Sequence, residues 1–184
     1  EDRRTVLDRL DKLERNLELT EQDAKSRNLL FFNIEENRHE DRAATVQVIT
    51  DLLNSCSAMD YWHQEDIVKA FRLGKPRVHG SDPRPVLVQF SRWADKMAVL
   101  GDSQLRDCLR QTGISVASDL TSRQKEMVNF YRSQGKIAFI YNGKLQVRDR
   151  QGARSWVPEE HRRQNQAAGY ALETDDWPHI HHNG

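Results

Sequence analysis

The chain has 184 residues and no net charge; 30% of the residues are charged and 37% are hydrophobic, a polar composition that still permits a folded core. No apolar run approaches the ~20 residues that a helix needs to cross a bilayer, so we expect no membrane partner. No signal peptide is visible, and the first residue is Glu rather than Met, so we expect the chain to be a segment of a longer protein.

The charges are unevenly distributed along the chain. Residues 1–23 carry a net charge of −3, residues 24–66 carry −4, residues 67–154 carry +10 and residues 155–184 carry −3. A basic middle between acidic ends indicates a surface that binds a polyanion. The alternative is an ordinary solvated surface that is rich in lysine and arginine.

Residues 3–24 have the pattern of a helix with a heptad seam. Leu10 and Leu17 take the a positions of the heptad, and Val6 and Leu13 take the d positions. The segment from Arg9 to Glu14 reads Arg-apolar-x-x-apolar-Glu and resembles the trimerisation motif of short parallel coiled coils. We therefore expect a homotrimer, with a dimer as the alternative, or else a helix that packs on its own domain. The expected oligomerisation residues are Val6, Arg9, Leu10, Leu13, Glu14 and Leu17.

The middle of the chain alternates between strand and helix patterns. We expect, in chain order, a strand over 28–34, a helix over 41–58, strands over 67–73 and 86–90, a helix from Ser91, a helical turn around 105–109 and a strand over 114–116. Asn37 with Glu40 is the expected cap of the first helix, and Ser91 that of the second. The order is βαββαβ, which predicts a four-stranded sheet with both helices on one face and the other face open for a ligand.

A smaller module follows. Thr121 with Gln124 three residues later predicts a capping box that begins a helix, and Gly135 ends it. Residues 136–150 predict a β-hairpin, because Asn142-Gly143 is the best two-residue type I′ turn. Residues 158–184 are polar and are expected to be disordered or loosely attached.

The cysteines and histidines give little sign of chemistry. Cys56 and Cys108 lie inside apolar helical patterns without CxxC spacing, so we expect two reduced core residues in a cytosolic or nuclear protein. The cluster His179, His181 and His182 lacks further ligands. No Gly-rich phosphate loop, Gly-x-Ser-x-Gly or His-Glu-x-x-His occurs, so we expect no enzymatic activity, no cofactor, no bound metal and no small-molecule substrate.

Four ordered segments, together with the upstream heptads, resemble a known family. They are Leu29–Ile34 followed by Glu35-Glu36, then Phe71–Lys75, then Arg84–Ser91 followed by Ala94-Asp95-Lys96, and finally Gly113–Val116 leading to Asp119-Leu120-Thr121. Residues 6–150 thus resemble the protein encoded by the first open reading frame of LINE-type non-LTR retrotransposons. Two features depart from the family: Val128 and Asn129 stand where a basic pair is expected, and no closing helix is evident after Trp156.

The resemblance implies a fold and a function. The fold would be α+β, with a parallel coiled coil over 1–25, an RRM-like βαββαβ domain over 26–118, a helix and hairpin module over 119–157 and a polar tail over 158–184. The function would be that of a homotrimeric nucleic-acid chaperone that binds single-stranded RNA and DNA in a cytoplasmic ribonucleoprotein, with the nucleus as a further location. A copy domesticated by its host would look the same.

The sheet lacks the aromatic residues on which an ordinary RRM stacks bases. Strand alternation places Leu30, Pro85 and Leu87 at the usual stacking positions and Phe90 in the core, while Phe32 can remain on the open face. We therefore expect phosphate contacts to provide most of the affinity. The phosphate-binding candidates are Arg72, Lys75, Arg77, Arg84 and Arg92. The alternative for residues 74–85 is a mobile polar connection.

The hairpin offers a second surface. Alternation around Asn142-Gly143 places Phe139, Tyr141, Lys144 and Arg148 on the side away from the helix, a mixture of rings and cations that suits single-stranded nucleic acid. The alternative is that the two rings pack at a domain interface. Basic residues that would extend this surface are Arg123, Lys125, Arg132 and Lys136.

Two other functions remain open at this point. The first is a coiled-coil scaffold whose RRM-like domain binds protein partners, which the missing stacking aromatics favour. The second is a host RNA-binding protein with an ordinary sequence-specific RRM, which Leu30, Pro85 and Leu87 argue against. The charge of +10 over residues 67–154 favours nucleic-acid binding over the protein-binding scaffold.

Overall fold

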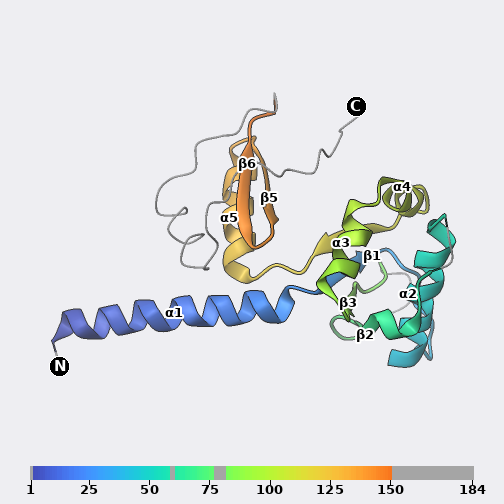
Figure 1. Ribbon diagram of the computed structural model, residues 1–184, viewed down its shortest axis with the longest axis horizontal. Coiled ribbons are helices and arrows are strands. Elements are labelled where there is room, and N and C mark those ends of the chain that lie inside the picture. Colours follow the sequence, from blue (N-terminus) through green and yellow to red (C-terminus); the bar gives the residue numbers. More distant parts are fainter. Residues whose placement is uncertain (1, 59–60, 77–81, 151–184) are drawn as a thin grey trace. The chain divides into compact units, whose positions relative to one another are not determined.

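A computed structural model describes residues 2–58, 61–76 and 82–150 (Figure 1). Arg77 and the polar tail over 158–184 lie outside the described residues. The chain divides into two compact units, one spanning Arg27–Asp119 and the other formed by the residues before and after it. The expected coiled-coil segment and the C-terminal module therefore belong to one unit, and the middle of the chain is a unit of its own.

The unit Arg27–Asp119, hereafter the sheet unit, is a mixed α+β fold. Its elements are β1 (Asn28–Phe32), α2 (Arg42–Cys56), the 3-10 turn η1 (Gln64–Asp66), β2 (Ile67–Arg72), β3 (Val86–Phe90), α3 (Trp93–Gly101), α4 (Ser103–Gln111) and β4 (Ser115–Ser118). The four strands form an antiparallel sheet in the order β2-β3-β1-β4. The expected α+β class and element order are confirmed, and the helical turn expected around 105–109 is a helix of nine residues, α4.

One face of the sheet forms the core. Leu29 and Phe31 of β1 and Val86, Val88 and Phe90 of β3 are fully buried, because successive strand residues point to opposite faces. Their helical partners in the core include Ile49, Leu53, Leu105 and Leu109. The prediction that Phe90 lies in the core is confirmed, while Leu30 and Leu87 point to the opposite face and are half-buried.

A β-bulge in β2 changes the parity of that strand. The pairing with β3 shifts between Ile67 and Lys69, so that Ile67 and Ala70 are both buried although three positions separate them. Arg72 then lies opposite Val86 on the core side, and Phe71 lies opposite Leu87 on the other side. The bulge thus decides which β2 side chains a ligand on the open face can meet.

The ends of the sheet unit lie next to each other. Asn28 Nδ2 donates to Asp119 Oδ2 at 3.0 Å, and the backbone N–H of Asp119 donates to the carbonyl of Asn28 at 3.5 Å. The chain therefore enters the unit at β1 and leaves it after β4 at one place.

Both expected helix caps of the sheet unit are wrong. The N-cap of α2 is Asp41, whose side chain accepts from the backbone N–H of Ala44. Asn37 and Glu40 form the turn before the helix, in which the backbone N–H of Asn37 donates to Glu40 Oε2 at 3.3 Å. The N-cap of α3 is Arg92 without a capping side chain. The hydroxyl of Ser91 instead donates to the carbonyl of Glu65 at 2.6 Å and joins the start of α3 to η1.

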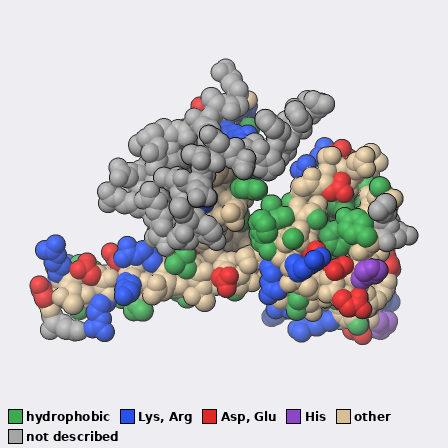
Figure 2. Space-filling view, in the orientation of Figure 1, with side chains coloured by type: hydrophobic (Ala, Val, Ile, Leu, Met, Phe, Trp, Pro, Cys, Tyr) green, Lys and Arg blue, Asp and Glu red, His purple; other side chains and the backbone are tan. Residues whose placement is uncertain are grey.

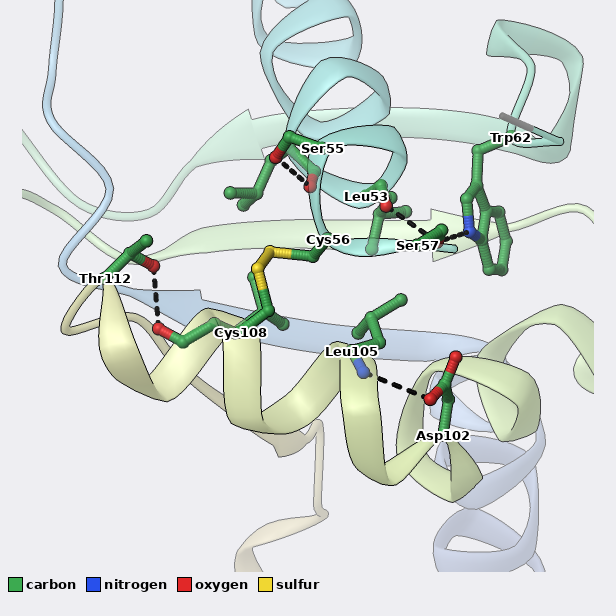
Figure 3. Close-up of a disulfide and its surroundings, with 11 residues drawn as sticks. Leu53, Ser55, Cys56, Ser57, Trp62, Asp102, Leu105, Cys108 and Thr112 are labelled. Carbon is green, nitrogen blue, oxygen red and sulfur yellow. Dashed lines mark hydrogen bonds between the residues drawn. A yellow bond between two sulfur atoms is a disulfide. The ribbon is translucent and has the colours of Figure 1, made fainter. Parts of the chain in front are cut away.

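The expectation of two reduced cysteines is also wrong, since Cys56 and Cys108 form a disulfide (Figure 3). Each cysteine faces the core as its helical pattern predicted. The pattern could not show that the last turn of α2 packs beside α4, where the two Cα atoms are 5.5 Å apart, within the range that a disulfide spans.

We predict that reduction of this disulfide destabilises the sheet unit. The bond closes a loop with a sequence separation of 52, for which the loss of chain entropy in the unfolded state corresponds to about 4 kcal/mol at 25 °C. Urea unfolding of the wild type should shift to lower concentration when a dithiol reductant is present. The Cys56→Ala/Cys108→Ala variant should match the reduced wild type and not respond to the reductant; a response would contradict the explanation.

The second unit contains the long helix α1 (Arg3–Lys25), the helix α5 (Ser122–Ser133) and the hairpin β5 (Ile137–Tyr141) and β6 (Lys144–Arg148). The capping box of Thr121 and Gln124 is confirmed, and so is the turn at Asn142 and Gly143, which have φ values of 48° and 72°. Thr121 also donates to Glu18 Oε1 at 2.6 Å, which joins the start of α5 to α1.

No residue of α1 is buried. The four seam residues Val6, Leu10, Leu13 and Leu17 are 40–69% exposed. Figure 2 shows charged side chains of both signs and apolar side chains side by side along this helix. A helix of this kind leaves its apolar stripe in water unless another chain covers it.

Candidate nucleic-acid interface

The hairpin has two chemically different sides. Ala138, Leu145 and Val147 are buried, and they pack with Val128 and Tyr131 of α5. The alternation along β5 and β6 places the intervening residues on the other side, the outer face of the hairpin. The strands pair from Ile137 with Arg148 to Tyr141 with Lys144, as the alternation around the Asn142-Gly143 turn predicts.

The outer face combines rings and cations, as predicted. It carries Phe139, Tyr141, Lys144 and Arg148, all half-buried. The guanidinium carbon of Arg148 lies 5.9 Å from the centroid of the Phe139 ring, within the range of a cation–π contact. Tyr141 lies directly opposite Lys144 across the strand pair. Each ring therefore has a cation as its neighbour. In such an arrangement a base can stack on the ring while its phosphate contacts the cation.

The four further basic residues of this module have different surroundings. Lys125 and Arg132 are exposed, and Arg123 and Lys136 are half-buried. Arg132 Nε donates to the carbonyl of Ala138 at 2.9 Å, so this side chain also fastens α5 to β5. Residues 120–150 contain seven basic and two acidic residues, a net charge of +5.

The sheet unit, by contrast, is close to neutral. Residues 27–119 contain 12 basic and 13 acidic residues, a net charge of −1. Of the net charge of +10 over residues 67–154, residues 67–119 carry +4 and residues 120–154 carry +6. Electrostatic attraction of a polyanion is correspondingly weaker at the sheet unit.

Arg72, predicted to bind phosphate, is instead a structural residue. A guanidinium has five N–H groups, and each of them donates within the protein: to Glu40 Oε1 at 3.0 Å, to Glu40 Oε2 at 3.1 Å and to the carbonyls of Ile34, Glu35 and Arg84. The side chains of Arg72 and Glu40 are only 5% and 3% exposed. The reason is the bulge in β2, which turns Arg72 toward the core.

The pKa of Glu40 reflects this pair. Burial raises it, but hydrogen bonds from Arg72 and Thr45 outweigh the effect and the pKa lies below its usual value. Glu40 is therefore charged at neutral pH inside the protein. A buried carboxylate without its partner would be strongly unfavourable.

Arg84 is also held within the sheet unit. Its Nε donates to Glu36 Oε1 at 2.9 Å, its Nη2 contacts the same carboxylate, and its Nη1 donates to the carbonyl of Gly74 at 2.8 Å. These hydrogen bonds to the carboxylate lower the pKa of Glu36 and raise that of Arg84. A phosphate would have to replace Glu36 to reach this guanidinium.

The remaining candidates of the sheet unit are at the surface. Lys75 is exposed on the segment after β2. The side chain of Arg92 is 71% exposed and pairs with Asp95, with its Nη2 at 2.7 Å from Oδ1. The structure thus separates the predicted phosphate residues into two that hold the fold together and two that face solvent.

One group of residues was missed by the sequence analysis. The Phe71 ring has the guanidinium carbon of Arg42 at 5.4 Å and Lys69 Nζ at 5.9 Å from its centroid. Lys69 and Phe71 are two positions apart on one strand, a spacing that could have been noticed. Arg42 begins α2, and nothing in the sequence indicates that it reaches β2.

Two classes of site are not found in the described part of the chain. Within residues 2–58, 61–76 and 82–150, no helix is long and apolar enough to span a bilayer. Over the same residues, no three His, Cys, Asp or Glu side chains gather closely enough to hold a metal ion. The histidine cluster at 179–182 lies outside them.

No protein-family model matches the chain, and no curated protein matches it either.

We predict that Arg72 and an exposed arginine differ in their importance for stability. Arg72→Ala should lower the free energy of unfolding by about 3–5 kcal/mol, because it leaves Glu40 buried without its partner. Arg110→Ala is the matched control: Arg110 pairs with Asp107 at the surface and should cost less than about 1 kcal/mol. Urea unfolding measures both, and equal losses would contradict the structural role of Arg72.

Proposed function

We propose that this chain is a non-enzymatic protein that self-associates through α1 and binds single-stranded RNA and DNA. The outer face of the hairpin is the observation that supports this proposal most directly. It joins two rings with two cations in a module whose net charge is +5. Stacking on aromatic rings next to backbone-neutralising cations is the common way to hold single strands without sequence preference.

The sheet unit is consistent with the same function. Its four-stranded antiparallel sheet with the strand order β2-β3-β1-β4 supports an RRM-like reading, although two helices, α3 and α4, lie between β3 and β4. The resemblance to the first-open-reading-frame protein of LINE-type retrotransposons suggests a homotrimer that coats the element's RNA as a nucleic-acid chaperone in a cytoplasmic ribonucleoprotein. The hairpin module rather than the sheet unit would provide most of the charge for this task.

The second candidate function is a coiled-coil scaffold whose sheet unit binds proteins. The specific observation in its favour is the net charge of −1 of the sheet unit. In addition, Arg72 is paired with Glu40 and Arg84 with Glu36 inside this unit. A host protein domesticated from such an element fits this function equally well. Measured affinity for nucleic acid separates the two functions.

We predict that the full chain binds a mixed-sequence single-stranded RNA and that the affinity falls steeply with salt. Lys144→Ala/Arg148→Ala should weaken binding and reduce the salt slope by up to about 1.4, if each cation contacts one phosphate. The matched control is Arg106→Ala/Arg110→Ala, which removes two cations from α4. Fluorescence anisotropy at several salt concentrations gives both numbers.

Equal losses in the two double variants would contradict the assignment to the hairpin. Absence of binding even at low salt would remove the nucleic-acid function and leave the scaffold.

We also predict that the chain assembles through the seam of α1. Leu10→Asp/Leu13→Asp places charges in the seam and should convert a species of about three times 21.5 kDa into a monomer. Arg15→Asp, at an f position of the same heptads, is the control and should not change the mass. Light scattering coupled to size exclusion measures it, and a wild-type monomer would contradict the coiled coil.

A further inference from the structure

The open face of the sheet unit carries an apolar row that crosses all four strands. Phe71 of β2 lies opposite Leu87 of β3, Leu87 opposite Leu30 of β1, and Leu30 opposite Ala117 of β4. The three large side chains are half-buried and Ala117 is exposed. Their strand neighbours on the other parity fill the core, so this row faces away from it.

The row ends at the edge strand β2 in the ring of Phe71. At the opposite edge, the side chains that β4 contributes to this face, Ser115 and Ala117, are small and exposed. They leave space for a ligand above this edge. A second row beside the first is polar, with Lys69 opposite Gln89 and Gln89 opposite Asn28. An apolar row next to the exposed Lys69 and the half-buried Gln89 suits a planar ligand whose edge can form hydrogen bonds.

The cations around Phe71 indicate the charge of that ligand. Arg42 approaches the ring from α2 and Lys69 from the same strand, both within 6 Å of the centroid. An apolar peptide segment has no need of two cations beside the ring. A nucleotide has both parts, a base that stacks and a phosphate that the cations attract.

We propose that Phe71, with Arg42 and Lys69 beside it, binds an unpaired nucleotide of single-stranded nucleic acid, the base on the ring and the apolar row and the phosphate at the cations. This site is displaced to the edge strand β2, away from the central strands, where Leu30 and Leu87 occupy the usual stacking positions. The inference rests on the proposed nucleic-acid function, and it adds a second contact on a different unit from the hairpin.

The test is a double-mutant cycle between protein and ligand. The full chain binds an oligothymidylate and an abasic oligonucleotide of the same length, as wild type and as Phe71→Leu, which keeps an apolar side chain but removes the ring. Phe71→Leu should weaken binding to oligothymidylate about tenfold, the effect of one stacked base, and leave binding to the abasic strand unchanged. Phe71→Trp should bind oligothymidylate at least as tightly as the wild type.

A control variant and a second measurement accompany the test. Phe130→Leu alters another ring, 52% exposed on α5, and should change neither affinity. If Phe71→Leu lowers the melting temperature, the wild type is photocross-linked to an oligonucleotide containing 4-thiouracil, and an adduct should map to Phe71 or Lys69.

Equal weakening on both strands, no weakening, or adducts confined to the hairpin would overturn the proposed nucleotide site. In that case binding that still depends on Lys144 and Arg148 would keep the proposed function. Failure of the wild type to bind either strand would overturn both.

Discussion

The structure of the sheet unit depends on one buried guanidinium. Arg72 ends β2 on the core side, and its five hydrogen bonds reach the segment after β1, the carboxylate of Glu40 and Arg84, two residues before β3. No single strand pairing joins these segments. Because the guanidinium is planar and all five of its N–H groups donate hydrogen bonds, lysine could not replace it. These hydrogen bonds hold the loops at this edge of the sheet in one conformation.

This network pairs two of the positive charges of the sheet unit with carboxylates. Glu40 neutralises Arg72 and Glu36 neutralises Arg84. The positive charges of these two arginines, at the end of β2 and just before β3, are therefore paired inside the unit. The hairpin module has only Glu126 and Asp149 against its seven cations. If three chains assemble through α1, three such modules act on one strand, and their joint binding can exceed the affinity of each by orders of magnitude.

Much of the fold was predictable because local rules and tertiary structure agree. The bounds of β3 and the hairpin register follow from alternation and from the Asn142-Gly143 turn. The structure differs from the prediction where a contact between residues far apart in the sequence determines the local conformation. Neither the bulge that turns Arg72 inward nor the packing of α2 beside α4 that joins Cys56 to Cys108 has a local signature. The site is predictable to the same extent: the hairpin face came from alternation, whereas Arg42 beside Phe71 did not.

The pairing of Asn28 with Asp119 has a consequence for how such a chain could arise. A unit whose chain enters and leaves it at neighbouring positions can be inserted into another protein at a single point, because the two ends of the host chain stay close together. Here the interrupted partner is the unit in which Thr121 contacts Glu18 of α1. The sheet unit is in this sense a cassette, and sequence on either side of it can change without altering how its ends are closed.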